Sequence, residues 1–270
     1  MSNRPIGLLD SGIGGLTVLK AVKHLLPHES FIYIGDSARN PYGNRTEKEI
    51  IKYTEELVNF LLLQDVKMIV IACNTATALT LTLLKEKLNI PVIGVISAGS
   101  REAARLSETG HIGVLATQST VDSQFYSESI ARERKTVEVT SLACPEFVDL
   151  VEANQHTGAD AEQVVAEKLA PLKIQTIDTL ILGCTHFPLL SDYIQKVMGE
   201  EVKLIDSGAL TAVSIRDVLK EEQLEAEADH QSPMMKIFTT GDAELFRVIA
   251  AEWMENDSLE IAHISLEGLI

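Results

Sequence analysis

The chain alternates between short apolar runs and longer segments in which apolar positions recur every three to four residues. The apolar runs, rich in Val, Ile and Leu, lie near residues 5–10, 31–35, 67–72, 91–96, 111–116, 136–142, 178–183 and 202–206. Such runs are typical of buried strands, and the amphipathic segments between them are typical of helices. The alternation predicts an α/β fold with parallel sheets and helices on both faces.

One helix start is marked by its capping residues. The stretch "TEKE", Thr46 to Glu49, has the Thr and the Glu three positions later that together form a capping box. Apolar side chains then follow at helical spacing: Ile50, Tyr53, Leu57, Phe60 and Leu61. We therefore expect a helix over residues 46 to 64.

The order of strands is repeated along the chain. "IGLLDSG" at Ile6 matches "IGVLATQ" at Ile112, and "MIVIACNTA" at Met68 matches "TLILGCTHF" at Thr179, at offsets of 106 and 111 positions. At the same two offsets, "FIYIGDS" falls opposite "VEVTSLA" and "PVIGVIS" opposite "VKLIDSG". The repeat predicts two similar halves of four strands each.

These halves suggest a division into domains. The first domain is expected to comprise residues 1–97 together with 207–270, and the second residues 98–206, with the active site in a cleft between them. The tail from about 209 to 270 has a helix-dense pattern, and its acidic stretch "EEQLEAEADHQSP" is expected to be an exposed loop. In open parallel sheets, ligands bind at the carboxyl ends of the strands.

Two repeated strands each end in a cysteine, Cys73 and Cys184. Hydrogen-bonding side chains follow at once: Asn74 and Thr75 in the first case, Thr185 and His186 in the second. A single cysteine at a strand end is commonly a small core residue. Its recurrence at equivalent strand ends favours a functional pair, because a helix N-terminus there stabilises a thiolate. Two such thiols could invert one stereocentre, one removing a proton and the other supplying one.

Three further groups could assist the thiols. Asp10 ends the first strand in "LLDSG", where the alternative is a helix N-cap. His186 lies two residues after Cys184, where the alternative is an ordinary polar group at a strand end. Glu152 follows the sixth strand and is expected to be a surface acid on a helix.

Other chemistries fit the motifs less well. "DSGIGG" is not a dinucleotide fingerprint, because Thr17 replaces the third glycine; it suits a tight turn that offers Ser11 and backbone amides to a carboxylate. "NPYG", Asn40 to Gly43, is either a plain turn or a lip over the cleft. The cysteines lack the arginine of a phosphatase loop, the glycines of a nucleophile elbow, and enough companion ligands for a metal.

Composition narrows the partners. A formal net charge of -16 argues against nucleic acid, but a small anion can still be bound by backbone amides. Three cysteines without a CxxC pair suggest free thiols in a reducing compartment. The sequence has no targeting signal and no apolar run of about 18 residues, so we expect a cytoplasmic protein without a membrane span.

The chain resembles the cofactor-independent aspartate/glutamate racemase family. The resemblance rests on "IGLLDSGIGGLTVLK", "DSARNPYG", "VIACNTATA", "DTLILGCTHFPLL" and "FTTG", which span nearly the whole chain. The paired cysteine motifs are specific, whereas the glycine turn alone is not. Two positions depart from the family pattern: Asn40 where Cys is common, and Ala98 where Pro precedes Gly99. We expect the first to alter the lip and the second to loosen the hinge between the halves.

The resemblance implies an isomerase that interconverts L- and D-glutamate for peptidoglycan synthesis, without pyridoxal phosphate or metal, and commonly as a homodimer. It assigns proton abstraction from D-glutamate to Cys73 and from L-glutamate to Cys184, assisted by Asp10 and His186 respectively. Substrate-binding positions also carry over: Asp10, Ser11, Tyr42, Gly43, Asn74, Thr75, Thr185 and His186. The alternatives are racemisation of aspartate or another acidic amino acid, and binding of a small anion without catalysis.

Overall fold

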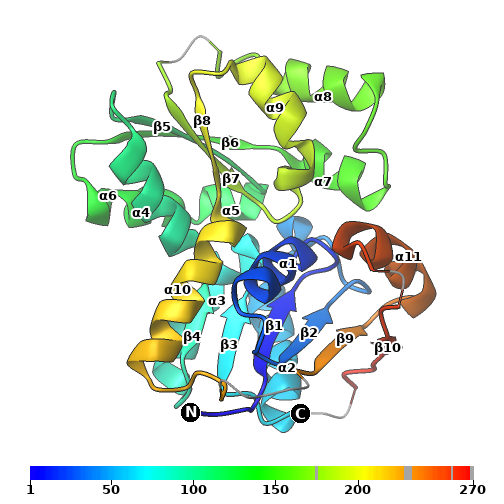
Figure 1. The fold of residues 1–270 in the computed structure, drawn as a ribbon. Coiled ribbons are helices and arrows are strands. Elements are labelled where there is room, and N and C mark those ends of the chain that lie inside the picture. Colours follow the sequence, from blue (N-terminus) through cyan, green and yellow to red (C-terminus); the bar gives the residue numbers. More distant parts are fainter. Residues whose placement is uncertain (174–175, 228–232, 257, 268–270) are drawn as a thin grey trace. The chain divides into compact units, whose positions relative to one another are not determined.

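The computed structural model describes residues 1–173, 176–227, 233–256 and 258–267. By the density of internal contacts the chain forms two units, Met1–Val95 with Gly208–Ile270, and Ile96–Ser207. Of the acidic loop expected at 221–233, residues 228–232 lie outside the described part. Each unit is an α/β structure built on a parallel sheet (Figure 1).

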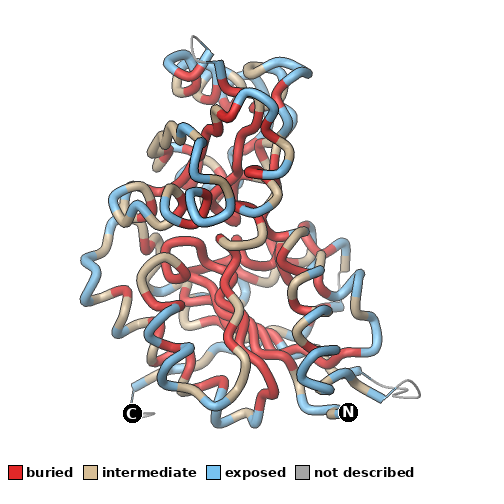
Figure 2. The backbone as a smooth tube through the Cα atoms, turned by 90° about the vertical axis from the view of Figure 1, so that its left-hand side faces the viewer, coloured by how far each residue is buried: buried red, intermediate tan, exposed pale blue. Residues whose placement is uncertain are grey.

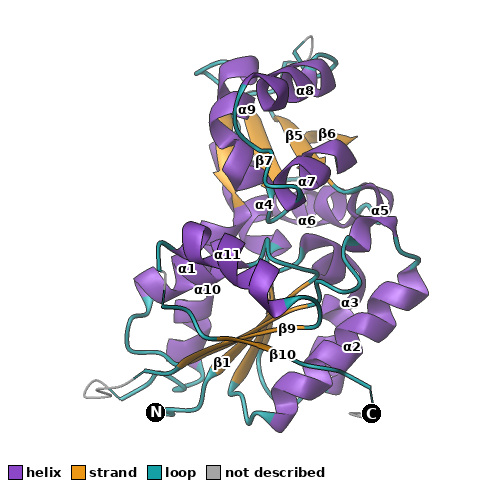
Figure 3. Ribbon diagram, turned by 90° about the vertical axis from the view of Figure 1, so that its right-hand side faces the viewer, coloured by secondary structure: helices purple, strands orange, loops and turns teal. Residues whose placement is uncertain are grey.

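The described part of the first unit contains a six-stranded parallel sheet in the order β10-β9-β2-β1-β3-β4. Its strands are β1 (Ile6–Asp10), β2 (Phe31–Gly35), β3 (Met68–Ile71), β4 (Val92–Gly94), β9 (Met235–Thr239) and β10 (Ile261–His263). Helices α1 (Leu16–Leu25), α10 (Ser207–Glu221) and α11 (Ala243–Met254) lie on one face, and α2 (Glu47–Leu63) and α3 (Asn74–Lys87) on the other (Figure 3).

The second unit has a four-stranded parallel sheet in the order β6-β5-β7-β8 within the described residues. Its strands are β5 (His111–Ala116), β6 (Glu138–Ala143), β7 (Thr179–Gly183) and β8 (Lys203–Asp206). Its helices are α4 (Ile96–Leu106), α5 (Gln118–Asp122), α6 (Phe125–Glu133), α7 (Pro145–Glu152), α8 (Ala159–Leu169) and α9 (Ser191–Met198). Helices α4 and α6 pack together beside one face, and α8 and α9 beside the other (Figure 1).

Strand register confirms the repeat for the two strand pairs that carry the candidate residues. Leu9 pairs with Ile71 in the first sheet, and Leu115 pairs with Leu182 in the second, at the predicted offsets of 106 and 111. The alignments of β2 with β6 and of β4 with β8 were wrong by one or two positions. Asp10 pairs with Gly35 and Ala116 with Ala143, so β2 and β6 are offset by 108 positions (143 minus 35) rather than 106.

The fourth pair of strands is displaced by one position. Ile71 pairs with Gly94 and Leu182 with Asp206, so β4 and β8 are offset by 112 (206 minus 94) rather than 111. Helices of different lengths precede these strands in the two units, and insertions there shift the offset without disturbing the strand order.

The prediction of four strands in each half is confirmed, but the tail, which was expected to be helical, adds two strands to the first sheet. Strand β9 pairs with β2 along its whole length, and β10 extends the sheet beyond β9. The central strands β1, β2 and β3 of this sheet are fully buried (Figure 2). Strands β9 and β10 have partly exposed positions. Short strands near a sheet edge carry a weak apolar signal, so the pattern of the surrounding helices concealed them.

The predicted helix start is confirmed. Thr46 precedes α2, its hydroxyl accepts a hydrogen bond from the Glu49 amide, and the Glu49 carboxylate accepts one from the Thr46 amide at 2.9 Å. The loop between β2 and α2 contains a short 3₁₀ helix, Tyr42–Asn44, which includes Tyr42 and Gly43.

Candidate active site

In the first unit, Cys73 lies between the end of β3 and the start of α3. Its Sγ occupies the N-cap position of α3, where it accepts a hydrogen bond from the Ala76 amide at 3.5 Å. The Ser11 hydroxyl lies 3.7 Å from the same sulfur. The side chain is 5% exposed. Free amides at a helix start favour a thiolate over a thiol, so this position suits a cysteine that gains and loses a proton.

Asp10 and Ser11 reach the same end of the sheet from the neighbouring strand. Asp10 is the last residue of β1 and is fully buried, and its carboxylate accepts a hydrogen bond from the Gly12 amide at 3.0 Å. The N-cap alternative for Asp10 is wrong, because α1 begins after Gly15 and has no side-chain cap. The carboxylate instead shapes the turn that presents Ser11 beside Cys73.

In the expected lip, the hydroxyl of Tyr42 is hydrogen-bonded within the protein. The Tyr42 hydroxyl donates to the Asp36 carboxylate at 2.5 Å, and the side chain is 1% exposed. Burial, and then the Asp36 charge, raise the pKa of Tyr42 far above its usual value, so it remains a protonated donor. Because that donor is engaged with Asp36, the backbone of Tyr42 is the part of the residue left to contact a ligand. Gly43 lies within the 3₁₀ helix and has no positive φ.

Asn74 and Thr75 are the first two residues of α3, and both are buried, at 4% and 3% exposure. Asn40, which departs from the family pattern, packs its amide against Gly12: a Cβ on Gly12 would lie 3.1 Å from the Asn40 Cγ. The effect of Asn40 on the lip stays a prediction. Ala98 lies inside α4 of the second unit.

The second unit presents Cys184 directly after β7. Its Sγ lies 3.5 Å from the His186 Nδ1, and the Thr185 hydroxyl is also 3.5 Å from that nitrogen. The three side chains are 7%, 2% and 6% exposed respectively for Cys184, His186 and Thr185. An imidazole in contact with a thiol can stabilise the thiolate as an ion pair.

Glu152 was expected to be a surface acid on a helix. It does lie on a helix and its side chain is 30% exposed, but the pairing of its carboxylate with His186 was not foreseen. Glu152 ends α7, and its carboxylate lies 2.5 Å from the His186 Nε2. Burial alone would lower the pKa of His186, but the Cys184 sulfur and the Glu152 carboxylate outweigh burial and raise that pKa well above its usual value. The Cys184 sulfur and the Glu152 carboxylate on either side of the ring therefore favour the imidazolium form of His186.

Sequence reasoning missed Tyr126, which packs beside Cys184. A Cβ on Gly183 would lie 3.0 Å from the Tyr126 ring and 2.6 Å from the Leu115 carbonyl oxygen, so only glycine fits before Cys184. The Tyr126 hydroxyl lies 3.3 Å from the Ser207 hydroxyl. Burial raises the pKa of Tyr126, so it stays protonated. The glycine in "LGCTH" was the available signal for a bulky neighbour.

The third cysteine has a different environment. Cys144 aligns with Asp36 in the repeat. Asp36 follows Gly35, which pairs with the last residue of β1, and Cys144 follows Ala143, which pairs with the last residue of β5. Burial raises the pKa of Cys144 to about 12, which leaves it a neutral thiol. All three cysteines are free.

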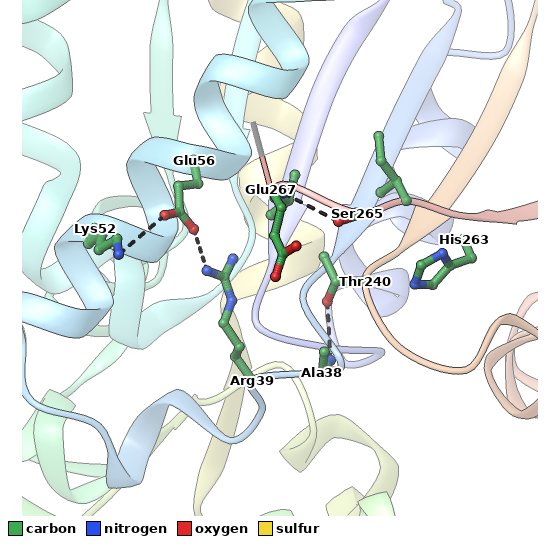
Figure 4. Close-up of a pocket in the computed structure, with 10 residues that line it drawn as sticks. Ala38, Arg39, Lys52, Glu56, Thr240, His263, Ser265 and Glu267 are labelled. Carbon is green, nitrogen blue, oxygen red and sulfur yellow. Dashed lines mark hydrogen bonds and ion pairs between the residues drawn. The ribbon is translucent and has the colours of Figure 1, made fainter. Parts of the chain in front are cut away.

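Within the described residues, no cluster of three or more His, Cys, Asp or Glu could hold a metal, and no helix is long and apolar enough to cross a membrane. The first unit also has a cavity of about 550 Å³, bordered by Arg39 and Thr240 (Figure 4). None of the predicted site residues lines this cavity.

The two parallel α/β units each place a cysteine two residues beyond equivalent paired positions, Ile71 and Leu182, which is the architecture of a duplicated α/β half. The helix start that was expected at both thiols is present only at Cys73, because a turn and the 3₁₀ helix Phe187–Leu190 follow Cys184. The chain belongs to the Asp/Glu/hydantoin racemase family, whose model matches residues 15–215.

Comparisons with individual proteins give the same family. The chain is 50% identical over 268 residues to a glutamate racemase of Lactococcus lactis, covering 99% of this chain and 98% of that one. It resembles the crystal structure of a Bacillus anthracis glutamate racemase at a TM-score of 0.95 and 41% identity, covering 98% and 99% of the two chains. It also resembles the Francisella tularensis glutamate racemase in complex with D-glutamate, at a TM-score of 0.91 and 35% identity, covering 99% of both.

Proposed function

We propose that this protein racemises glutamate without a cofactor, with Cys73 and Cys184 as the two acid/base groups. The observation that carries the proposal is the register: Cys73 and Cys184 each lie two residues beyond paired, equivalent positions, Ile71 and Leu182. The similarity to glutamate racemases over nearly the whole chain supports glutamate as the substrate. In this proposal the domains 1–97 with 207–270, and 98–206, supply one thiol each.

The reaction moves one proton off Cα and another on. From L-glutamate, the Cys184 thiolate removes the Cα proton, and the Cys73 thiol donates its proton to the opposite face of the resulting planar carbanion. From D-glutamate the roles are exchanged. The number of protons on enzyme and substrate is unchanged, and the configuration is inverted. This mechanism requires both sulfur atoms to reach Cα from opposite faces.

The surrounding groups have separate tasks. Helix α3 and Asp10 assist Cys73, while His186 and Glu152 assist Cys184. Neutral groups bind the substrate carboxylates: Ser11, Asn74, Thr75, Thr185 and the backbone at Tyr42 and Gly43. The resemblance further supports a cytoplasmic homodimer whose D-glutamate serves peptidoglycan synthesis.

Exchange of the Cα proton with solvent tests the reaction. In deuterated water, L-glutamate should lose optical rotation while D-glutamate forms with deuterium at Cα, as observed by mass spectrometry or proton NMR. Loss of rotation with the original hydrogen retained at Cα would exclude proton abstraction by the thiols.

Single substitutions test the two bases. Cys73→Ser and Cys184→Ser should each reduce kcat for racemisation by about 10²- to 10⁴-fold, since general acid/base groups contribute on that scale. Cys144→Ser is the matched control and should remain within about twofold of the wild type, because Cys144 is a neutral buried thiol. Near-full activity in either of the first two variants would contradict the two-base mechanism.

The alternatives make different predictions. An aspartate racemase would have the higher kcat/KM for aspartate, although one methylene changes pocket discrimination by only ~1–3 kcal/mol. A non-catalytic binder of small anions would bind glutamate without exchange of its Cα proton. Alkylation of the thiols by iodoacetamide, with and without glutamate, then reports binding separately from turnover.

A further inference from the structure

The motif "FTTG", at the end of β9, has no role in the proposed chemistry. It lies beside Asp36, a fully buried carboxylate that follows β2. The Thr240 hydroxyl donates to Asp36 Oδ1 at 2.7 Å, and the Tyr42 hydroxyl donates to Asp36 Oδ2 at 2.5 Å. Asp36 therefore connects the end of β9 to the lip residue Tyr42. A buried carboxylate needs such donors, because an unpaired buried charge is costly.

The contact between β9 and the lip loop continues along neighbouring residues. The Thr240 hydroxyl oxygen accepts a hydrogen bond from the Ala38 amide at 3.1 Å (Figure 4). The Ser37 hydroxyl lies 2.5 Å from the Thr239 hydroxyl and accepts from the Gly241 amide at 3.2 Å. The Thr240 hydroxyl thus makes two hydrogen bonds to the start of the loop, one to the Asp36 carboxylate and one to the Ala38 backbone amide.

Arg39 supports the same loop from the side of α2. Its Nε donates to Asp36 Oδ2 at 2.7 Å, and its Nη1 pairs with Glu56 of α2. The guanidinium lies 4.0 Å from the centre of the Tyr53 ring, and that ring packs 5.8 Å from the ring of Tyr42. Tyr42 is therefore fixed at its hydroxyl by Asp36 and at its ring by Tyr53.

We propose that Thr240 is a positioning residue for the substrate-binding loop, which through Asp36 fixes Tyr42 and Gly43 in the conformation that binds glutamate. The inference rests on the proposed function, in which the backbone of this loop contacts the substrate. Without the Thr240 hydroxyl, Asp36 loses one donor and Ala38 loses its acceptor. A loosened loop must be ordered when the substrate binds, so affinity falls while the thiols are unaffected.

Thr240→Val and Thr240→Ser test this inference, because both keep the size of the side chain approximately and only the second keeps the hydroxyl. We expect Thr240→Val to raise KM about tenfold for both L- and D-glutamate, with kcat within about twofold of the wild type. A rise in KM at constant kcat indicates lost binding that the ground state and transition state share. Thr240→Ser should restore KM to within about twofold.

Controls separate positioning from stability. Thr136→Val changes an exposed threonine of the second unit and should leave KM unchanged. If Thr240→Val does not fold, Ser37→Ala removes the parallel contact to β9 and should raise KM in the same way. An unchanged KM, or a fall in kcat at constant KM, in the folded variant would overturn the inference.

The outcome can also be distinguished from failure of the proposed function. If the wild type does not racemise glutamate, the proposed function fails, and calorimetric titration with glutamate still compares Thr240→Val with the wild type. Weaker binding of glutamate by the variant would then support positioning, and equal binding would refute it.

Discussion

Replacing Glu152 by glutamine isolates the charge that supports His186. In the wild type the His186 Nε2 lies 2.5 Å from the Glu152 Oε1. The substitution keeps an oxygen that can accept a hydrogen bond from Nε2, but removes the negative charge. Hydrogen bonds to charged groups contribute about 1.5–3 kcal/mol and those between neutral groups about 0.5–1.5 kcal/mol. The difference of ~1 kcal/mol or slightly more corresponds to a fall of roughly one unit in the pKa of His186.

The direction of the pH effect follows from the sign of this shift. His186 has a raised pKa in the folded protein, so the imidazolium beside Cys184 is present at neutral pH and is lost as the pH rises through that raised pKa. Glu152→Gln lowers the pKa, and the imidazolium is therefore lost at a lower pH. The alkaline limb of kcat/KM should move down by about one pH unit, and kcat/KM should fall about tenfold above the new pKa.

Racemisation measured by circular dichroism from pH 5 to 10 gives this profile for both enantiomers. Glu146→Gln is the matched control, because Glu146 lies on the same helix, pairs with Lys168 and is about half exposed. Its profile should coincide with that of the wild type. An unshifted alkaline limb in Glu152→Gln, or an equal loss of activity at every pH, would refute the role assigned to the Glu152 charge.

Two further predictions concern groups outside the proposed chemistry. Burial opposes ionisation of Asp178, but hydrogen bonds, first from Thr109 and then from Ser107, outweigh it and lower the pKa of Asp178 to about 2. The resulting stabilisation, about 2 kcal/mol, is present above pH 4 and is lost as the pH falls toward 2. In urea unfolding, the difference in free energy of unfolding between the wild type and Asp178→Asn should therefore close over that range. A difference that stays constant with pH would contradict the linkage. Cys144, with its pKa raised to about 12, should react with iodoacetamide at pH 8 more slowly than the other two thiols, and peptide mapping that found it alkylated first would contradict its burial.

The fold features visible in the sequence were those determined by local rules. The capping box at Thr46 and the buried runs of β1, β3, β5 and β7 combine short-range signals with continuous apolar stretches. Strand β9 is instead specified by pairing with β2 across about 200 positions of sequence, and β10 by pairing with β9. A partly exposed edge strand of three to five residues gives no periodic signal strong enough to separate it from a loop.

The site shows the same division. Cys73 and Cys184 could be found because the repeat marks both, and because polar side chains follow each cysteine directly in sequence. Glu152 lies 34 positions from His186, and Thr240 lies 204 positions from Asp36. Such contacts depend on how α7 and β9 pack, so nothing in the local pattern of either residue distinguishes it from a surface acid or a strand-end threonine.

The repeat preserves the backbone positions of the thiols but not their partners. Asp10 aligns with Ala116, and Thr75 aligns with His186, so the acid at the strand end occurs only in the first unit and the imidazole only in the second. Because L- and D-glutamate have equal free energies, kcat/KM in the proposed reaction must be the same in both directions at every pH. The different partners of the two thiols can therefore make kcat and KM differ between the two directions, but they cannot make kcat/KM differ. The Glu152, His186 pair should then shift the pH dependence of kcat for L-glutamate, whose proton Cys184 removes, more than that for D-glutamate, with KM changing in compensation.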